Sequence, residues 1–425
     1  MSAIQFRVHH AAAGSSARRG AIQTPHGAID TPAFVTVGTQ AAVKGVTPQE
    51  LHEAGAQALL ANTYHLYLRP GPQLVAELGG LHRFMAWDGP LMTDSGGYQV
   101  FSLGFGLEHG IGKLVGMFPD ETDPSAASGG LRTGSPRQPR IGQRPRLTRV
   151  DDQGVTFTSH IDGSRHRLTP ELSIEIQEQL GADIILAFDE PTSPLHDEAY
   201  TVEALERTHS WAVRCLEARS RDGQALFGIV QGGAFREPRK RSADFIAALP
   251  FDGFAIGGSL GRSKRDMERV LEWSVPLLPA EAPRHMLGIG EPEDLFACVA
   301  RGIDTFDCVA PTRHARHGIV YTAGGKLNLQ QPRHRDSDLP VEAGCPCYTC
   351  QHFSRAYIHH LFRAQELLAY TLTSVHNLQA ILGLMARIRT AIERGQLEAL
   401  QADVLEAYRS HRPDALPWAA ANADS

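Results

Sequence analysis

The chain has 425 residues, of which 42% are hydrophobic, and its formal net charge is −6. This length allows one large core, and the negative charge argues against a generally basic nucleic-acid binder, although positive charge can still gather locally. No apolar run reaches the roughly eighteen residues of a membrane span, and residues 1–23 lack the apolar core of a signal peptide. We therefore expect a cytoplasmic protein without membrane attachment.

Eight short apolar runs recur along the chain, and each has the length of a β-strand. Continuous apolar runs indicate strands that are buried on both faces, as in a parallel sheet. Helix-like stretches lie between several of them, at residues 170–180, 197–219, 264–277 and 292–301. Eight β-α repeats predict an α/β fold, a (β/α)8 TIM barrel, in which functional groups gather at the carboxyl ends of the strands. The eight runs occupy residues 33–37, 58–62, 91–93, 184–188, 226–230, 254–256, 285–289 and 306–308.

The run at residues 91–93 leads into Asp94-Ser95-Gly96-Gly97-Tyr98. Two successive glycines allow a sharp turn and a close approach of the backbone to a ligand. Asp94 and Tyr98 would then point at that ligand, and the alternative is an ordinary turn at the end of a strand. The pattern repeats after other runs, which favours a functional site. At the carboxyl ends of these other runs lie Asp189, Gln231, Gly257-Gly258 and Asp307.

Two groups of basic residues are suited to RNA phosphates. The first lies between residues 132 and 149 and contains six arginines without an acidic residue. The second includes Arg313 and Arg316, which follow Asp307 and so adjoin the expected active face. The alternative for both groups is a solvated surface, and the alternative for Asp307 is a structural ion pair with Arg313 or Arg316.

Three of the six cysteines, Cys345, Cys347 and Cys350, form a Cys-x-Cys-x-x-Cys cluster in a turn-rich segment. Thiolates at this spacing favour a structural zinc ion, which needs a fourth ligand. Redox thiols are the alternative, but three clustered cysteines are an awkward number for intramolecular disulfides. The spacing leaves the fourth ligand open among four histidines, namely His352, His359, His360 and His376.

The order and combination of motifs give the chain a specific resemblance. It resembles the tRNA-guanine transglycosylases, also called queuine tRNA-ribosyltransferases, of the bacterial catalytic type. The resemblance covers nearly the whole chain except the stretch around residues 105–150. The motifs that carry it include Thr31-Pro32-Ala33-Phe34, Asn62-Thr63-Tyr64-His65-Leu66, the residues 94–99 and 159–164, Ala187-Phe188-Asp189-Glu190, Gly257-Gly258, Phe306-Asp307-Cys308-Val309, Pro311-Thr312-Arg313 and His376-Asn377.

The resemblance implies a reaction in queuosine biosynthesis. Family members replace guanine at the first (wobble) anticodon position of tRNAs for Asp, Asn, His and Tyr by a 7-deazaguanine, through a covalent enzyme–RNA intermediate. Asp307 matches the nucleophile, and Asp94 matches the general acid/base. The residue chemistry agrees, because a carboxylate ester splits base exchange into two easier steps and a second carboxyl group can shuttle the proton.

Base recognition can be assigned to the other strand ends. An ionised Asp189 can accept two hydrogen bonds from the amidine edge that guanine and the 7-deazaguanines share. Gln231 and the backbone N–H of Gly258 would address the carbonyl edge, and the ring of Tyr98 would stack on the base. Simple packing is the alternative for Gln231 and Tyr98.

The resemblance also implies the metal ligands and an assembly. In the family, the three cysteines and the histidine of the His-Asn pair bind one structural zinc ion per subunit, which corresponds here to Cys345, Cys347, Cys350 and His376. The zinc subdomain helps to hold tRNA and supports a homodimer. We expect a catalytic barrel at residues 1–330 with a flexible insertion at about 104–150, and a zinc-binding subdomain with helices that complete the barrel at residues 331–425.

Two departures from the family pattern concern the incoming base and the insertion. Relatives that use 7-aminomethyl-7-deazaguanine typically carry Cys where this chain has Pro191. They also typically contain the sequence Gly-Gly-Leu-Ala-Val-Gly, whereas the corresponding segment of this chain, residues 257–262, is one residue shorter and lacks the valine. Both changes predict a larger pocket and hence use of queuine. The second half of the insertion is rich in Gly, Pro, Ser and Arg, which predicts mobility, and it either touches RNA or hangs in solvent.

Two other functional classes use the same scaffold. A non-catalytic partner subunit is disfavoured because Asp94 and Asp307 are both retained. An archaeosine-type transglycosylase would carry additional C-terminal RNA-binding domains, for which the helices expected between Ser354 and His411 leave no room. Both observations favour the catalytic, anticodon-directed enzyme.

Overall fold

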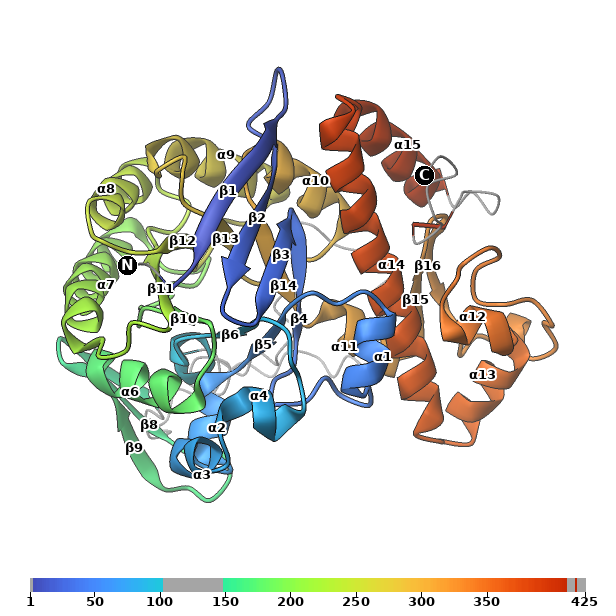
Figure 1. Cartoon of the computed structure of the whole chain (residues 1–425), viewed down its shortest axis with the longest axis horizontal. Helices are drawn as coiled ribbons and strands as arrows, with labels where there is room; N and C mark the ends of the chain where they lie inside the picture. Colours follow the sequence, from blue (N-terminus) through green and yellow to red (C-terminus); the bar gives the residue numbers. More distant parts are fainter. Residues whose placement is uncertain (1–2, 102–147, 411–416, 419–425) are drawn as a thin grey trace, which may run out of the picture.

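A closed barrel of parallel strands forms the centre of the molecule (Figure 1). The computed structural model describes residues 3–101, 148–410 and 417–418. The barrel strands are β4 (Ala33–Val37), β5 (Leu59–Ala61), β6 (Leu91–Thr93), β10 (Ile184–Leu186), β11 (Ala225–Val230), β12 (Gly253–Ile256), β13 (Arg284–Met286) and β14 (Thr305–Cys308). Around the barrel they follow the order β10-β11-β12-β13-β14-β4-β5-β6. The expected (β/α)8 barrel is confirmed, and each of the eight apolar runs supplies one strand.

The barrel strands are buried on both faces, which explains their continuous apolar runs. All five residues of β4 are buried. Val35 belongs to the apolar cluster inside the barrel, whereas its neighbour Phe34 belongs to the cluster between the strands and the outer helices. Because successive side chains of a strand point to opposite faces, a strand between two apolar layers needs apolar residues at every position.

Helices surround the barrel, and local signals fix where several of them begin and end. Thr169 caps α6 by accepting the Leu172 N–H, and Gly181 ends that helix at a φ of 76°. Ser263 and Asp266 form a capping box at the start of α9. The helices of this region are α1 (Pro48–Glu53), α2 (Thr63–Leu68), α3 (Pro72–Glu77), α4 (Gly80–Met85), α6 (Pro170–Leu180), α7 (Glu198–Ala218), α8 (Arg236–Ala247), α9 (Lys264–Ser274), the 3-10 helix η2 (Val275–Leu277), α10 (Pro292–Ala300) and α11 (Ala310–Arg316).

Two antiparallel sheets of three strands accompany the barrel. The first consists of β1 (Gln5–Ala11), β2 (Arg18–Thr24) and β3 (Gly27–Thr31), and it covers the amino ends of the barrel strands (Figure 1). Its Ile22 and Ile29 join the cluster inside the barrel. The second consists of β7 (Thr148–Asp151), β8 (Gly154–Thr158) and β9 (Arg165–Leu168). The first sheet thus closes the end of the barrel opposite to the strand carboxyl ends.

The C-terminal part packs on the barrel through one long helix. This part comprises the hairpin β15 (Ile319–Thr322) and β16 (Gly325–Asn328), the 3-10 helix η3 (Pro332–His334), and α12 (Tyr348–His352), α13 (Arg355–Arg363), α14 (Leu368–Glu393) and α15 (Leu397–Ser410). Helix α14 contacts β4 and α11. A separate apolar cluster, which includes Val320, Leu329, Ile358 and Leu372, joins the hairpin to α13 and α14.

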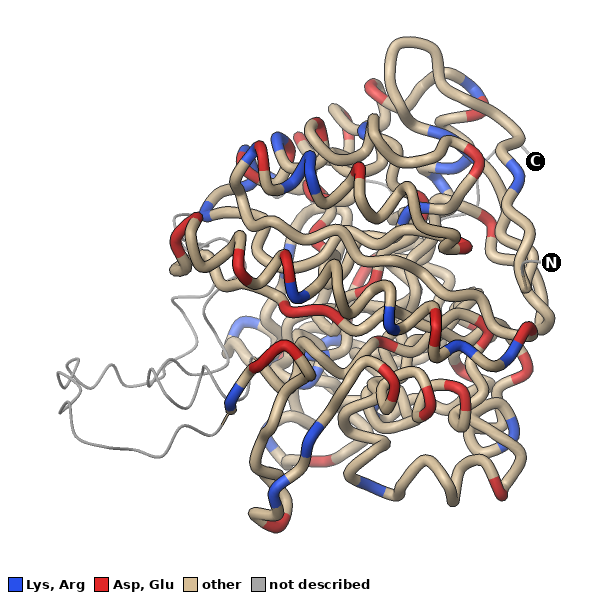
Figure 2. Tube along the Cα trace, turned by 90° about the vertical axis from the view of Figure 1, so that its left-hand side faces the viewer, with Lys and Arg blue, Asp and Glu red and all other residues tan. Residues whose placement is uncertain are grey.

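Charges of both signs are interspersed on the side of the molecule formed by α6, α7 and α8 (Figure 2). One example is Arg214 of α7, whose Nε lies 2.7 Å from Glu171 Oε1 of α6. This side therefore offers no uniformly basic surface. Among the described helices, none combines the length and apolar character needed to cross a bilayer.

Arg18 and Asp304 form a buried ion pair that fastens the first sheet to the barrel. Arg18 Nε and Nη2 lie 2.8 and 2.6 Å from the two Asp304 carboxylate oxygens, and Asp304 is fully buried. We predict that Arg18→Ala lowers the free energy of unfolding by about 3–5 kcal/mol, because it leaves a buried charge without its partner.

The matched control is Arg167→Ala, which removes an exposed pair with Asp151. We expect this change to cost less than about 1 kcal/mol. Chemical denaturation of the two variants measures both values. Similar small losses in both would contradict a fastening role for Arg18.

Candidate active site and metal centre

The site residues expected from the sequence gather at the carboxyl ends of the barrel strands. Asp94 directly follows β6, Gln231 directly follows β11, Gly258 lies just beyond β12, and Asp307 lies in β14. Asp189 lies shortly after β10. Because β6, β10, β11 and β12 are successive neighbours in the barrel, the structure brings four of these residues to one side of the barrel mouth.

Asp94 receives hydrogen bonds on both carboxylate oxygens. Oδ1 accepts from the backbone N–H of Thr63 at 2.8 Å, and Oδ2 accepts from the side-chain amides of Asn62 and Gln99, the latter at 2.7 Å. Burial raises the pKa of Asp94 above its usual value, the hydrogen bonds oppose that rise, and the charge of Asp307 adds to it. A carboxyl group with a raised pKa beside a second carboxylate is suited to acid/base work.

Asp189 is a buried carboxylate with two side-chain donors. Ser95 Oγ donates to Oδ1 at 3.1 Å, and Gln231 Nε2 donates to Oδ2 at 2.6 Å. Burial is the main reason that the pKa of Asp189 rises to about 6, and the charge of Asp94 contributes. At neutral pH Asp189 is therefore mostly ionised and can accept further hydrogen bonds from a ligand.

Gln231 and Gly258 present an acceptor and a donor next to Asp189. The buried Oε1 of Gln231 has no hydrogen-bond partner, and the N–H of Gly258 has no acceptor among the described residues. Gly258 has a φ of +70°, and a Cβ there would lie 1.9 Å from Gln231 Oε1. The backbone conformation therefore favours glycine at this position, and a side chain there would displace Gln231.

The hydrogen bonds to Asp307 converge on one carboxylate oxygen. Oδ1 accepts from the backbone N–H of Gly288 at 3.0 Å and lies 3.2 Å from His285 Nε2. The ring of His285 is fully buried, and its Nδ1 lies 2.9 Å from Thr305 Oγ1. No hydrogen bond to Oδ2 is formed by the described residues. One oxygen of Asp307 is therefore oriented while the other is left for a reacting atom.

The remaining expected residues surround the mouth more loosely. Tyr98 is 62% exposed. Arg313 and Arg316 lie on α11, which begins shortly after Asp307. Neither guanidinium forms an ion pair with Asp307, so the structure does not support the alternative that Asp307 is a structural partner of these arginines. Arg316 Nη1 instead donates to the Thr312 carbonyl at 3.0 Å.

Sequence reasoning missed the residues that orient the two carboxylates. Asn62 and Gln99 belong to the motifs that were recognised, but they received no role. His285 was counted only as part of an apolar run. The available signal was a histidine inside a strand that is otherwise buried, since a buried imidazole needs polar partners.

Cys345, Cys347, Cys350 and His376 form a buried group whose ligand atoms all lie within 4.8 Å of one another. His376 Nδ1 lies 3.9, 3.5 and 3.3 Å from the three sulfur atoms in that order. Tetrahedral bonds of about 2.3 Å to sulfur and about 2.0 Å to nitrogen would separate sulfur and nitrogen by about 3.5 Å. The group therefore fits a four-coordinate metal ion.

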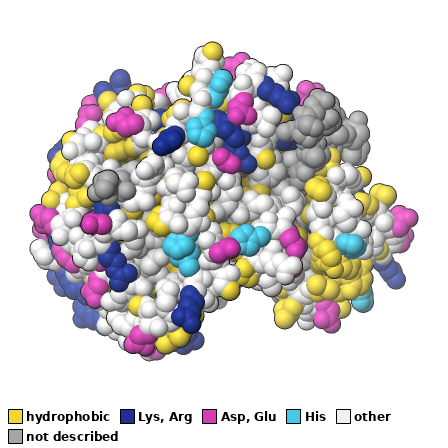
Figure 3. Space-filling view, in the orientation of Figure 1, with side chains coloured by type: hydrophobic (Ala, Val, Ile, Leu, Met, Phe, Trp, Pro, Cys, Tyr) yellow, Lys and Arg dark blue, Asp and Glu magenta, His cyan; other side chains and the backbone are white. Residues whose placement is uncertain are grey.

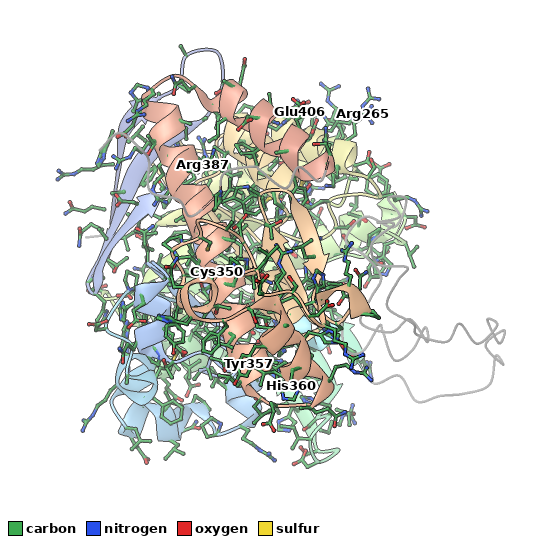
Figure 4. The ribbon with its side chains drawn as sticks, turned by 90° about the vertical axis from the view of Figure 1, so that its right-hand side faces the viewer. Arg265, Cys350, Tyr357, His360, Arg387 and Glu406 are labelled. Atoms are coloured by element: carbon green, nitrogen blue, oxygen red, sulfur yellow. The ribbon has the colours of Figure 1, made fainter. Side chains whose placement is uncertain are left out.

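The second ring nitrogen of His376 prepares it for this role. Nε2 lies 2.6 Å from the carbonyl oxygen of Tyr321. A hydrogen bond there places the proton on Nε2 and leaves the lone pair of Nδ1 for a metal. Cys350 lies on the side of the molecule shown in Figure 4, above Tyr357 and His360 of α13.

A second group of possible ligands consists of His26, His82 and Asp183. The two imidazole rings are stacked, with centroids 3.5 Å apart and an angle of 18° between their planes. A single ion cannot lie in both of two nearly parallel ring planes, as ligation by both histidines requires. The nitrogens instead lie 2.7 and 3.3 Å from the oxygens of Asp183. We interpret this group as a polar contact at the amino end of the barrel, with a hydrogen bond between His26 and Asp183.

The insertion expected at about 104–150 lies almost entirely outside the described residues. The same holds for the first arginine group, of which only Arg149, in β7, is described. The expectations of mobility and of RNA contact for this segment therefore stay predictions.

Comparisons with known proteins agree with one another. The sequence model of the family described as queuine tRNA-ribosyltransferase matches residues 13–113 and 134–410. A queuine tRNA-ribosyltransferase of Roseiflexus sp. is 49% identical over 408 residues, which cover 92% of this chain and 96% of the relative. Those of Herpetosiphon aurantiacus and Pelotomaculum thermopropionicum are 47% and 44% identical, covering 93% and 96% of this chain and 90% and 99% of the relatives.

Proposed function

Because this chain belongs to the queuine tRNA-ribosyltransferase family, we propose that its barrel mouth replaces guanine at the first anticodon position of tRNAs for Asp, Asn, His and Tyr by a 7-deazaguanine. Family membership makes the chain a pentosyltransferase with a tRNA and a free base as substrates. The observation that carries the finer proposal is the pair Asp94 and Asp307, two carboxyl groups at one mouth with different hydrogen-bond surroundings.

Asp307 is the proposed nucleophile. Its Oδ2 attacks C1′ of the nucleotide, the bond from C1′ to the guanine nitrogen breaks, and the electron pair of that bond goes to the base. The product is an ester between Asp307 and the ribose of the RNA. Gly288 and His285 support this role because they hold Oδ1 and thereby direct Oδ2.

Asp94 is the proposed general acid and base. It gives its proton to the departing guanine and takes a proton from the incoming base, which then attacks C1′ and releases the Asp307 carboxylate. The raised pKa of Asp94 supports the first step, since a carboxyl group must hold its proton until the base leaves. The second step restores both carboxyl groups to their starting states.

Asp189 and its neighbours are the proposed base-recognition residues. Asp189 would accept two hydrogen bonds from the amidine edge of guanine or of a 7-deazaguanine. Gln231 and the N–H of Gly258 would lie at the carbonyl edge, and the exposed ring of Tyr98 would stack on the base. Arg313 and Arg316 would contact RNA phosphates beside Asp307.

We predict that Asp307→Ala and Asp94→Ala abolish measurable exchange of radiolabelled guanine into an unmodified tRNA of the His or Tyr type. We expect losses of about 10³-fold or more for the nucleophile and about 10²–10⁴-fold for the acid/base. Asp244→Ala is the control, because Asp244 is an exposed residue of α8 away from the strand ends. Full exchange by either active-site variant would contradict the assignment of that residue.

The pKa of Asp189 predicts how base affinity depends on pH. The ionised carboxylate binds the base, so affinity is present above the pKa of about 6 and is lost as the pH falls through it. We expect the KM for guanine to be constant above about pH 7 and to rise by up to about tenfold per unit below pH 6. Steady-state exchange from pH 8 to pH 5 measures this dependence. A KM that stays constant over this range would contradict the proposed role.

We propose queuine as the incoming base. The support is Pro191, which is partly buried two residues after Asp189, together with the shortened segment 257–262. Competition between free queuine and 7-aminomethyl-7-deazaguanine tests this proposal, and we expect preferential exchange of queuine. Pro191→Cys should shift the preference toward the smaller aminomethyl base. A clear preference of the unchanged protein for the aminomethyl base would end the proposal.

We propose that the Cys3His group holds one zinc ion per chain, because three thiolates and one imidazole in tetrahedral geometry favour zinc. The ion would cross-link α12 and α14, which carry two of its ligands. No step of the reaction passes through it. Its binding free energy would instead stabilise the C-terminal part.

We also propose a homodimer whose interface includes the zinc subdomain. Hydrophobic side chains gather over this end of the molecule (Figure 3). Leu339, Tyr348 and Leu367 are 55%, 54% and 76% exposed, and Tyr357 of α13 is 40% exposed. An apolar surface of this kind is typical of a protein interface.

We predict that Cys350→Ser removes most of the bound zinc and weakens the dimer, because α12 and α14 lose the ion that would cross-link them. Metal analysis and sedimentation velocity measure the two effects. Cys298→Ser is the control, since Cys298 is a buried cysteine of α10 outside the group. A full zinc content in Cys350→Ser would contradict the ligand assignment.

A further inference from the structure

Arg239 of α8 is a fully buried guanidinium whose hydrogen bonds all go to backbone carbonyl groups. It forms no ion pair with any described residue. Its donors lie 2.6 Å from the oxygen of Gly233, 2.9 Å from that of Val230, 2.8 Å from that of Gly257 and 2.9 Å from that of Ser259. A buried cation without a carboxylate partner is costly, so the four carbonyl groups must be matched closely to its donors.

These four carbonyl groups belong to the two segments that meet the base in the proposed reaction. Val230 and Gly233 enclose the turn that begins with Gln231, and Gly257 and Ser259 enclose Gly258. Arg239 thus ties the strand ends of β11 and β12 together at the proposed base site. The turn after β11 approaches the backbone of α8 closely, because a Cβ on Gly232 would lie 2.7 Å from the backbone nitrogen of Arg239.

The contact with Gly257 bears directly on the proposed base donor. The carbonyl of Gly257 and the N–H of Gly258 belong to one peptide group. A cationic donor on the oxygen draws electron density from the nitrogen, so the N–H becomes a stronger hydrogen-bond donor. This N–H has no acceptor among the described residues, and it is therefore available to a ligand.

We propose that Arg239 is a positioning residue that aims and strengthens the Gly258 N–H toward the carbonyl oxygen of the base. The inference rests on the proposed function of the barrel mouth. When the bond from C1′ to guanine breaks, its electron pair enters the purine, and part of the negative charge appears on the carbonyl oxygen. A fixed donor at that oxygen stabilises the departing base more than the bound nucleotide, and this difference speeds the step.

Burial lowers the pKa of Arg239 to about 9. The guanidinium consequently keeps its charge at neutral pH, as the polarisation of the Gly257–Gly258 peptide requires. A neutral side chain of similar length would fill the space but would polarise nothing.

The test compares free guanine with 6-thioguanine, which keeps the amidine N–H groups but replaces the carbonyl oxygen by sulfur, a weaker acceptor. Calorimetry measures the affinity of the full-length, zinc-loaded protein for each base. We expect Arg239→Met to weaken guanine binding by about tenfold, as for the loss of one hydrogen bond to the base, and 6-thioguanine binding by less than about threefold. The preference for guanine should therefore collapse, and the rate of guanine exchange should fall with it.

Arg239→Lys provides a second variant that keeps the charge with fewer donors, and we expect it to restore part of the preference. Arg284→Met is the matched control. Arg284 is also buried, and its donors lie 3.1–3.3 Å from the carbonyl oxygens of Leu278, Pro279 and Gly302 near the amino end of the barrel. Its loss should lower stability without changing the ratio of the two affinities.

An equal loss of affinity for both bases in Arg239→Met and Arg239→Lys would overturn the proposal, because it would show only a general disturbance of the site. Unchanged affinities would overturn it as well. If Arg239→Met does not unfold cooperatively, the comparison is made with Arg239→Lys alone. Absence of guanine exchange in the unchanged protein would instead refute the proposed function, so the two failures are distinguishable.

Discussion

The gathering of three carboxyl groups, one buried and two partly buried, at one barrel mouth is the constraint on which the site depends. The charge of Asp307 raises the pKa of Asp94, and the charge of Asp94 raises the pKa of Asp189. Like charges repel more strongly away from water, so each group needs its own donors to stay in place. Asp94 accepts hydrogen bonds from amide groups, and Asp189 accepts them from a hydroxyl and an amide group. The partners of Asp307 are an imidazole and a backbone N–H. The different donor sets are consistent with the three different roles proposed for these three carboxyl groups.

The Cys3His group and β14, the strand that carries Asp307, share one hydrogen-bonded frame. Tyr321 accepts from His376 through its carbonyl oxygen, and its hydroxyl lies 3.0 Å from Nδ1 of His314 in α11. Asn377 donates to the carbonyl of Pro311 at 2.9 Å and accepts from the N–H of Tyr321 at 2.8 Å. Because α11 directly follows β14, the ion would support the position of Asp307 without taking part in the chemistry.

The sequence predicted those parts whose signal is local. Continuous apolar runs located all eight barrel strands, since a strand between two apolar layers has no polar face. The sheet of β1, β2 and β3 was missed because its half-buried strands contain no continuous apolar run, as the alternation of buried and partly exposed residues in β2 shows. His285 and Arg239 were missed for a different reason. His285 contacts a carboxylate 22 residues away in the sequence, and Arg239 contacts backbone carbonyl groups. Motifs of fixed residue spacing do not predict such contacts. Residue spacing also left the fourth ligand of the Cys3His group undecided, because His376 of α14 lies next to the cysteines only in the folded chain.

In the proposed reaction, Asp307 carries the ribose between the two bases. The most direct measurement is mass spectrometry of the protein after it is mixed with guanine-containing tRNA, quenched by denaturant and digested with nuclease and protease. Covalent catalysis by Asp307 predicts a ribose-linked adduct on the peptide that contains Asp307, present in Asp244→Ala and absent in Asp307→Ala. An adduct on another residue, or base exchange in single-turnover conditions without any adduct, would contradict it.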